Sequence, residues 1–158
     1  MTTKAQPTSG ETTPPSNWHR VRRSSRLGRA DAPAAESDAR SEGDRCRDAG
    51  RWVEAAVSYR IHLKQFPKDF AIWVQAGNCL KEAAKFDEAL AAYRQAIDLD
   101  DSDPDVFLQL GHLQKVMGRR DDAIEAYRKS IARRRDGNPA LGELKDLGVV
   151  APVEPVAG

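Results

Sequence analysis

The chain has 158 residues, of which 40% are hydrophobic and 31% are charged. This balance is typical of a globular protein, and the length leaves room for one domain. The formal net charge of +1 hides an asymmetry: six basic and two acidic residues give residues 1–34 a net charge of +4, which leaves −3 for residues 35–158. No apolar run reaches the about 20 residues that a membrane-spanning helix needs, and no signal-peptide pattern follows the N-terminus. We therefore expect a cytoplasmic protein.

Residues 1–35 are rich in Thr, Ser, Pro and Arg, with Trp18, Val21 and Leu27 as their larger apolar residues. Such a segment cannot bury enough apolar surface to offset the entropy of ordering it, so we expect a disordered basic tail. Its arginines, from Arg20 to Arg29, could contact nucleic acid or an anionic membrane. Short basic tails that only aid solubility are commoner than tails that bind nucleic acid or membranes. The stretch from Asn17 to Arg29 could also become helical when it binds an acidic partner.

Three residue types recur along the chain with a period of 34 residues. These are Gly43, Gly77 and Gly111; Ala55, Ala89 and Ala123; and Tyr59, Tyr93 and Tyr127. A period of this length indicates a solenoid, in which each unit buries its apolar face by stacking on the next unit.

The helical pattern predicts three helix pairs, at about 37–49 and 52–65, 70–83 and 86–99, and 104–117 and 120–134. A proline at the first helical position after an N-cap residue supports the start of the fifth helix at Asp103-Pro104. Asn138-Pro139 starts a capping helix at 139–147 in the same way. The repeats then cover about 36–69, 70–103 and 104–137 of a domain at 36–148, and residues 149–158 form a second disordered tail.

The repeated small residues need a physical reason, since glycine inside a helix costs about 1 kcal/mol relative to alanine. We expect the partner helix to approach closely at Gly43, Gly77 and Gly111. The repeated alanines lie on the second helix of each pair, where a larger side chain would overpack the crossing. The tyrosines follow one helical turn later, so they cover the same face.

These residues resemble the tetratricopeptide repeat. Trp73, Ala76, Gly77 and Leu80, followed by Phe86, Ala89, Tyr93 and Ala96, carry the resemblance in the second repeat. Phe107, Leu110, Gly111, Gly118, Ala123 and Tyr127 carry it in the third. The family's fold is all-α, a right-handed superhelical array of antiparallel helix pairs, and its members are non-catalytic modules that bind a peptide or a partner protein in the concave groove lined by the first helix of each pair.

The resemblance therefore implies a set of groove residues, two helical turns apart on the first helices. They are Arg40, Asp44, Arg47, Val74, Asn78, Lys81, Leu108, His112 and Lys115. Four of the nine are basic, Val74 and Leu108 are apolar, and Asn78 can both donate and accept hydrogen bonds, which suits the backbone of an extended peptide. A mixed polar face with two aliphatic residues would also fit a helix face that meets only solvent.

One subclass of the family grips the carboxylate tails of chaperones with a clamp of Lys, Asn, Asn, Lys and Arg. The matching positions in this chain are Arg40, Asp44, Gln75, Asp105 and Gln109. Because Asp44 and Asp105 would repel a carboxylate, we expect no chaperone-tail clamp.

Motifs for catalysis, cofactors and metals are missing from the sequence. The three histidines, His19, His62 and His112, have no metal-ligand spacing, and the glycines do not form a phosphate-binding loop. Cys46 and Cys79 lack a metal or redox spacing, so we expect two buried, apolar thiols. We predict that the protein is not an enzyme and needs neither a cofactor nor a metal.

The sequence thus favours a protein–protein interaction module with an unidentified protein or peptide partner. Two alternatives stay open: an accessory or recruiting subunit of a bacterial glycosyltransferase system, which similar repeats often accompany, and a nucleic-acid or membrane tether through Arg20–Arg29. We expect a monomer or weak self-association through the exposed end of the stack.

Overall fold

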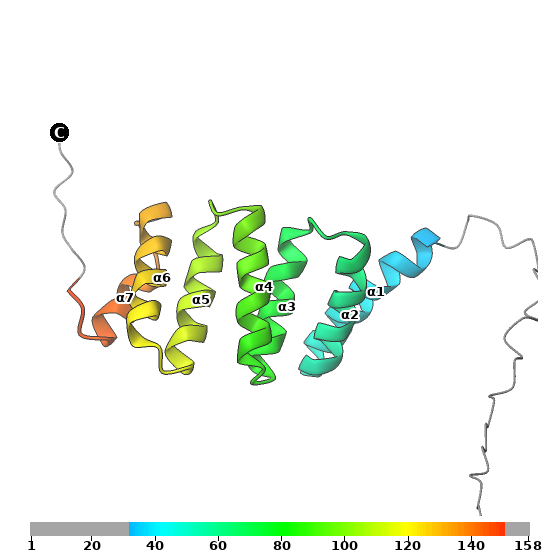
Figure 1. The fold of residues 1–158 in the computed structure, drawn as a ribbon, viewed down its shortest axis with the longest axis horizontal. Helices are drawn as coiled ribbons and strands as arrows, with labels where there is room; N and C mark the ends of the chain where they lie inside the picture. Colours follow the sequence, from blue (N-terminus) through cyan, green and yellow to red (C-terminus); the bar gives the residue numbers. More distant parts are fainter. Residues whose placement is uncertain (1–31, 151–158) are drawn as a thin grey trace, which may run out of the picture. The chain divides into compact units, whose positions relative to one another are not determined.

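A computed structural model describes residues 32–150 of the chain, and side chains from Ala39 onward. The described residues form seven α-helices and no strand (Figure 1). The helices are α1 (Ala32–Asp48), α2 (Trp52–Gln65), α3 (Phe70–Glu82), α4 (Phe86–Leu99), α5 (Pro104–Val116), α6 (Arg120–Arg133) and α7 (Ala140–Asp146).

The helix boundaries follow the sequence pattern within one residue at nearly every end. The exception is α1, which begins at Ala32 rather than near residue 37. Its added turn holds three alanines, which have the highest helix propensity, and Pro33, which is tolerated in the first turn of a helix. The predicted basic segment at Arg20–Arg29 and the predicted C-terminal tail beyond Val150 lie outside the described residues.

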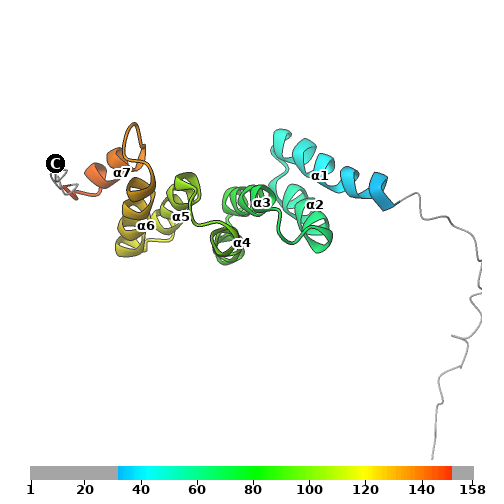
Figure 2. The same cartoon turned by 90° about the horizontal axis from the view of Figure 1, so that it is seen from above.

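The helices form two rows (Figure 2). One row holds α1, α3, α5 and α7, which are the first helices of successive pairs, and the other holds α2, α4 and α6. Each helix packs on the next one along the chain, and α3 also contacts α5. This arrangement is an all-α solenoid in which the first helices share one side of the array.

The core lies between the two rows. The larger cluster extends from Cys46 on α1 to Leu113 on α5, and includes the fully buried Tyr59 and Tyr93. A second cluster joins α5 and α6 to α7 through residues such as Tyr127 and Leu144. Because each cluster joins helices of neighbouring repeats, each unit of the solenoid depends on its neighbours.

Close approach of the helices explains the periodic glycines, as the sequence predicted. A Cβ atom added to Gly43 would lie 2.5 Å from the Tyr59 ring, one added to Gly77 would lie 2.6 Å from Tyr93, and one added to Gly111 would lie 2.4 Å from Tyr127. Distances below 3.0 Å essentially never occur for real Cβ atoms. The contact partner is thus the periodic tyrosine of the second helix.

The turn inside each pair repeats as well. Gly50 and Gly118 adopt the left-handed conformation, with φ of 69° and 74°, and Ala84 occupies the corresponding place in the second pair with φ of 57°. Left-handed backbone is unfavourable for a residue that has a Cβ atom. The second turn is therefore strained in a way that the first and third are not.

Both cysteines are buried free thiols, as predicted. Burial raises the pKa of Cys46, and it raises the pKa of Cys79 to about 11. A thiol with a raised pKa is a poor nucleophile at neutral pH, so both side chains act as small core residues.

Candidate functional site

The structure gathers the predicted groove residues on the row of first helices. We call this surface the inner face. It comprises Arg40, Asp44, Arg47, Val74, Gln75, Asn78, Lys81, Gln109, His112, Lys115 and Glu143, from α1, α3, α5 and α7. Eight of the nine residues predicted from sequence are partly or fully exposed there, and Leu108 is the exception.

Leu108 is buried, with 8% of its surface exposed, in the cluster that also holds Ala140 and Leu144. The expectation that it lines a groove is therefore wrong. This cluster joins α5 to α6 and α7, so Leu108 faces the core rather than the surface. Val74 is half-buried and packs against the larger core cluster, so it offers only part of its surface to a ligand.

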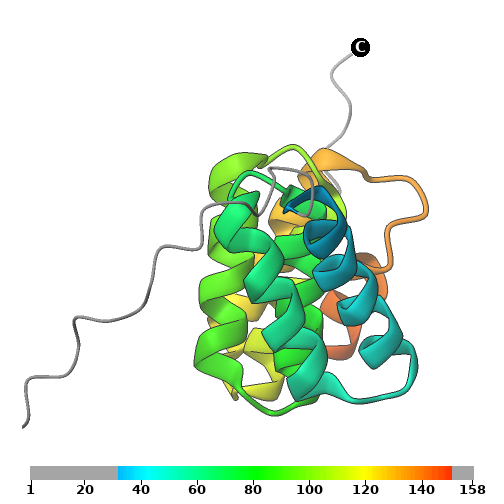
Figure 3. The same ribbon diagram turned by 90° about the vertical axis from the view of Figure 1, so that its right-hand side faces the viewer.

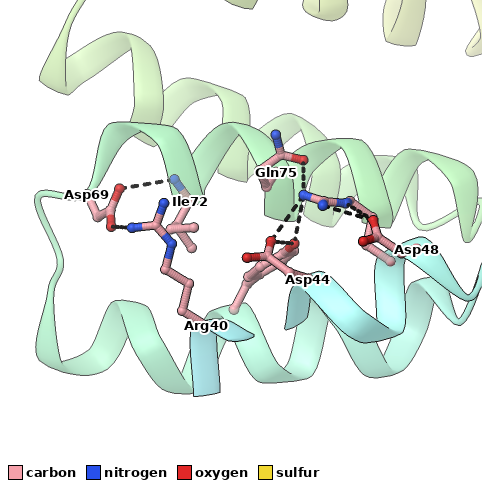
Figure 4. Close-up of polar contacts among 8 residues, drawn as sticks. Arg40, Asp44, Asp48, Asp69, Ile72 and Gln75 are labelled. Atoms are coloured by element: carbon pink, nitrogen blue, oxygen red, sulfur yellow. Dashed lines mark hydrogen bonds and ion pairs between the residues drawn. The ribbon is translucent and has the colours of Figure 1, made fainter. Parts of the chain in front are cut away.

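Arg47 donates hydrogen bonds to four side chains, of which Asp44, Asp48 and Gln75 are labelled in Figure 4. Its guanidinium donates to Asp44 at 3.1 Å, to Asp48 at 2.9 and 3.0 Å, to the Tyr59 hydroxyl at 3.3 Å and to Gln75 at 3.4 Å. The hydrogen bond to Asp48 is the main cause that raises the pKa of Arg47. With two carboxylates beside it, Arg47 positions its neighbours and keeps little free charge for a ligand.

A ladder of hydrogen bonds connects successive first helices. Arg47 donates to Gln75 at 3.4 Å, Lys81 to Gln109 at 3.1 Å, and Lys115 to Glu143 at 2.8 Å. Both the donors and the acceptors recur every 34 residues, so each rung spans one repeat junction in the same way. The acceptor is a neutral amide in the first two rungs and a carboxylate in the third.

The buried periodic tyrosines also hold inner-face side chains in place through their hydroxyl groups. The Tyr59 hydroxyl donates to Asp44 and the Tyr93 hydroxyl donates to Asn78, each at 2.7 Å. Burial is the main cause that raises the pKa of both tyrosines, so both hydroxyls keep their protons. Asn78 therefore accepts through Oδ1, and its amide nitrogen makes no hydrogen bond within residues 39–150.

The third repeat departs from this pattern. His112 occupies the place of Asp44 and Asn78, and its ring meets the edge of the Tyr127 ring at 5.7 Å between centroids. Glu143 on α7 lies 3.5 Å from His112 Nε2 and accepts from Lys115 and from the Tyr127 hydroxyl at 3.3 Å. Burial lowers the pKa of His112 despite this carboxylate, and Lys115 lowers the pKa of Glu143.

Charge along the inner face is consequently uneven. Arg40 lies 3.6 Å from Asp69, Arg47 contacts two carboxylates, and Lys115 contacts Glu143. Lys81 is bonded to the neutral Gln109, with Glu82 at 3.7 Å. The centre of the inner face, at Asn78 and Lys81, therefore combines an unused amide donor with a cation whose hydrogen bond goes to a neutral amide.

Within residues 32–150, no cluster of His, Cys, Asp or Glu side chains has the composition of a metal site. None of the seven helices described is long and apolar enough to cross a membrane.

The ladder was not predicted from the sequence, although the period of its acceptors is visible there. Gln75, Gln109 and Glu143 have the same period as the glycines and tyrosines, and they are the acceptors of the three rungs. The predicted groove cations are for this reason partly structural, since each one links its repeat to the next.

Comparison with known proteins agrees with the geometry. Residues 77–118 match a model of the TPR repeat, and residues 104–136 match a model of the tetratricopeptide repeat. No curated protein matches the chain in sequence.

Several solved structures have a similar fold. A MamA protein shares 19% identity over 73% of the chain with a TM-score of 0.66, and the match spans 63% of that protein's length. The first TPR domain of Spaghetti (RPAP3), bound to the HSP90 peptide SRMEEVD, shares 16% identity over 72% of the chain and 90% of its own, with a TM-score of 0.66. The TPR2B domain of yeast Sti1, in complex with an Hsp70 peptide, shares 22% identity over 72% of the chain and 93% of its own, with a TM-score of 0.62. Likenesses at these identities show the fold.

Proposed function

Because the chain belongs to the tetratricopeptide repeat family, we propose that it is a non-catalytic interaction module that binds a peptide of a partner protein on its inner face. The observation that carries this proposal is the pair Asn78 and Lys81 at the centre of that face. The Tyr93 hydroxyl donates to Oδ1 of Asn78 at 2.7 Å and thereby fixes the orientation of the amide. The amide nitrogen is left to donate to a ligand.

The chemistry of this pair favours an extended segment with an acidic side chain. An amide nitrogen can donate to a backbone carbonyl of the peptide, and the Lys81 ammonium, which has three donors, uses one on Gln109 at 3.1 Å. An acidic side chain of the ligand would complement the remaining charge of Lys81. Arg40, Val74 and His112 border this centre and contribute to specificity. A short peptide in such a site would bind with about micromolar affinity, near −8 kcal/mol.

Two of the similar structures hold chaperone peptides, but we propose that this chain does not bind a chaperone carboxylate tail. Asp44 and Asp105 occupy two positions of the clamp that grips such tails, and a third carboxylate, Asp48, lies 2.9 Å from Arg47. Bringing a free carboxylate to this region opposes like charges. Titration should therefore show that the SRMEEVD peptide binds no more tightly than the same peptide with an amidated C-terminus, and at least about tenfold tighter binding of the free carboxylate form would contradict this part of the proposal.

The direct test of the inner face selects ligands from a displayed library of random peptides with the full chain. The informative variant is Asn78→Asp, because Asp44 accepts from Tyr59 in the same way that Asn78 accepts from Tyr93. The substitution keeps the acceptor for Tyr93, removes the amide donor and adds a negative charge beside Lys81. Selected peptides should lose at least about tenfold in affinity, which is about 1.4 kcal/mol.

Lys129→Ala on α6 is the matched control. Lys129 is exposed and pairs with Glu125 one turn away on the same helix, in the row opposite the inner face. Peptides that bind Asn78→Asp as tightly as the unmodified protein would show that the inner face is not their site. The partner could be a glycosyltransferase that this chain recruits. A match between the selected peptide sequences and a segment of such an enzyme would support that alternative.

A further inference from the structure

The third repeat contributes a titratable histidine to the inner face. His112 lies on α5 with 31% of its side chain exposed. It occupies the place that Asp44 takes in the first repeat and Asn78 in the second. Of these three residue types, histidine alone has an ordinary pKa between pH 5 and 8. The inner face can therefore take up a proton near neutral pH at this repeat position.

Charged and polar groups from neighbouring helices face His112. Glu143 on α7 lies 3.5 Å from Nε2 of its ring, and the Tyr127 ring on α6 meets it edge-on. Lys115 follows one turn later on α5 and pairs with Glu143 at 2.8 Å. Because α7 continues the row of first helices, on the same side of the array as α1 in the end-on view of Figure 3, Glu143 reaches His112 from the side opposite to α3.

Lys81 acts on His112 from α3. Its ammonium donates to Gln109 at 3.1 Å, and Gln109 precedes His112 by three residues, so the two side chains are neighbours on the surface of α5. Burial is the main cause that lowers the pKa of His112, and Glu143 opposes it. The positive charges of Lys81 and Lys115 lower this pKa further. A negative charge brought to Lys81 would therefore act on His112 in the opposite direction.

We propose that an acidic side chain of a peptide bound at Lys81 binds together with a proton on His112, so that the inner face holds acidic peptides more tightly as the pH falls from about 7.5 to about 5.5. This coupling rests on the proposed function of the inner face. The carboxylate of the peptide would offset the charge of Lys81 and attract the imidazolium. By linkage, a peptide that favours the bound proton is itself favoured by that proton to the same degree.

Glu143 does not supply the full counter-charge of a protonated His112. It accepts from Lys115 at 2.8 Å and from the Tyr127 hydroxyl at 3.3 Å, and both distances are shorter than the 3.5 Å that separates it from His112. Its negative charge is thus shared among three donors. A second carboxylate, brought by a peptide, would still stabilise the imidazolium.

The groups in contact with His112 keep their charge in this pH range. Lys115 is the main cause that lowers the pKa of Glu143, and burial is the main cause that raises the pKa of Tyr127. Glu143 is therefore ionised and Tyr127 neutral throughout. An aspartate or glutamate of the peptide, with an ordinary pKa of about 4, is ionised as well. The change in binding over this range should consequently come from His112.

The first test needs no peptide. Gln109→Glu places a carboxylate at Lys81, about one helical turn from His112, and stands in for the acidic side chain of a ligand. The third rung of the ladder already pairs a lysine with a glutamate, at Lys115 and Glu143, so the fold should accept the change. In an NMR titration of the full chain, the His112 ring should protonate at a pH about 0.3 higher than in the unmodified protein. An unchanged or lower midpoint would overturn the proposal.

The second test measures binding. Peptides are selected from the random library at about pH 5.5, and fluorescence anisotropy gives the affinity of the tightest one at that pH and two units higher. The selected peptides should carry Asp or Glu and bind about twofold or more tightly at the lower pH. The same peptide with amides in place of its carboxylates should bind equally at both pH values. His112→Gln, whose amide can still donate to Glu143, should also bind the acidic peptide equally at both.

The outcomes distinguish this coupling from the proposed function. Peptides that Asn78→Asp weakens, but that carry no acidic residue or bind the unmodified protein equally at both pH values, would overturn the coupling and keep the inner face as the site. A pH dependence that persists in His112→Gln would assign the proton to another group and overturn the coupling as well. A selection without any peptide that Asn78→Asp weakens would contradict both proposals.

Discussion

The ring of Tyr93 occupies the space where a side chain on Gly77 would begin, since a Cβ atom there would lie 2.6 Å from Cε1 of the ring. The same ring carries the hydroxyl that donates to Asn78 at 2.7 Å. One tyrosine thus sets both the spacing of α3 and α4 and the position of the central residue of the inner face. If the inner face binds a peptide as proposed, this contact should couple ligand binding to stability.

Gly77→Ala should destabilise the protein although alanine is the better helix former. The added methyl group overlaps a fully buried ring that cannot move without disturbing the core, which costs about 1–3 kcal/mol. Gly142→Ala on α7 is the matched control, because no atom lies within 4 Å of the Cβ position there. That variant should gain up to about 1 kcal/mol. Urea unfolding followed by circular dichroism measures both, and a gain of stability in both variants would refute the contact.

Tyr93→Phe should lower the free energy of unfolding by about 1 kcal/mol, because it removes a hydrogen bond between partly buried groups. It should also weaken peptide binding, since Asn78 would no longer be held. Tyr127→Phe removes a longer bond, of 3.3 Å to Glu143, and should cost less. Equal losses of stability in the two variants would show that the hydrogen bond to Asn78 contributes no more to the free energy of unfolding than the hydrogen bond to Glu143.

Ala84→Gly should stabilise the protein by about 0.5–1 kcal/mol. Ala84 adopts φ of 57°, whereas the corresponding Gly50 and Gly118 adopt similar angles without a Cβ atom. The reverse change, Gly118→Ala, should destabilise the protein by a comparable amount. Thermal unfolding midpoints of the two variants should therefore move in opposite directions, and a lower midpoint for Ala84→Gly would contradict the assignment of strain to this turn.

Stability should fall in two stages as the pH is lowered. Burial lowers the pKa of His112 in the folded protein from its ordinary value of 6.5. The unfolded chain therefore binds a proton on His112 at a higher pH than the folded protein does. As the pH falls below 6.5, stability declines until the pH has passed the lowered pKa. Lys115 lowers the pKa of Glu143 from 4.5, so its contribution is present above pH 4.5 and is lost as the pH falls through the lowered value.

Unfolding in urea at a series of pH values measures this decline. His112→Gln should remove much of the loss between pH 7 and 5, and Glu143→Gln should reduce the loss below pH 4.5. A His112→Gln protein with an unchanged pH profile above pH 5 would show that His112 does not cause the first stage.

Most of the fold could be predicted from the sequence because the repeat is encoded by residues with a single physical role. Gly77, Ala89 and Tyr93 each fit one steric environment, and their recurrence placed the helices. The start of α1 at Ala32 was missed because the repeat pattern places a turn there, while the local preference of three alanines extends the helix.

The site was predicted less completely. The family resemblance placed Asn78 and Lys81 on the inner face. Leu108 is instead buried in the cluster that α5 shares with α6 and α7, and that depends on contacts between elements rather than on a repeat position. The roles of Gln75, Gln109 and Glu143 as acceptors also depend on which side chains meet across a repeat junction.

The most direct test of the central proposal is an NMR titration of the ¹⁵N-labelled full chain with the tightest peptide from the library. Binding on the inner face predicts that the largest amide shifts occur on α3 and α5, with the Asn78 side-chain amide among them, and that Asn78→Asp abolishes these shifts. Shifts confined to α2, α4 and α6, or an undisturbed Asn78 amide at saturation, would contradict it.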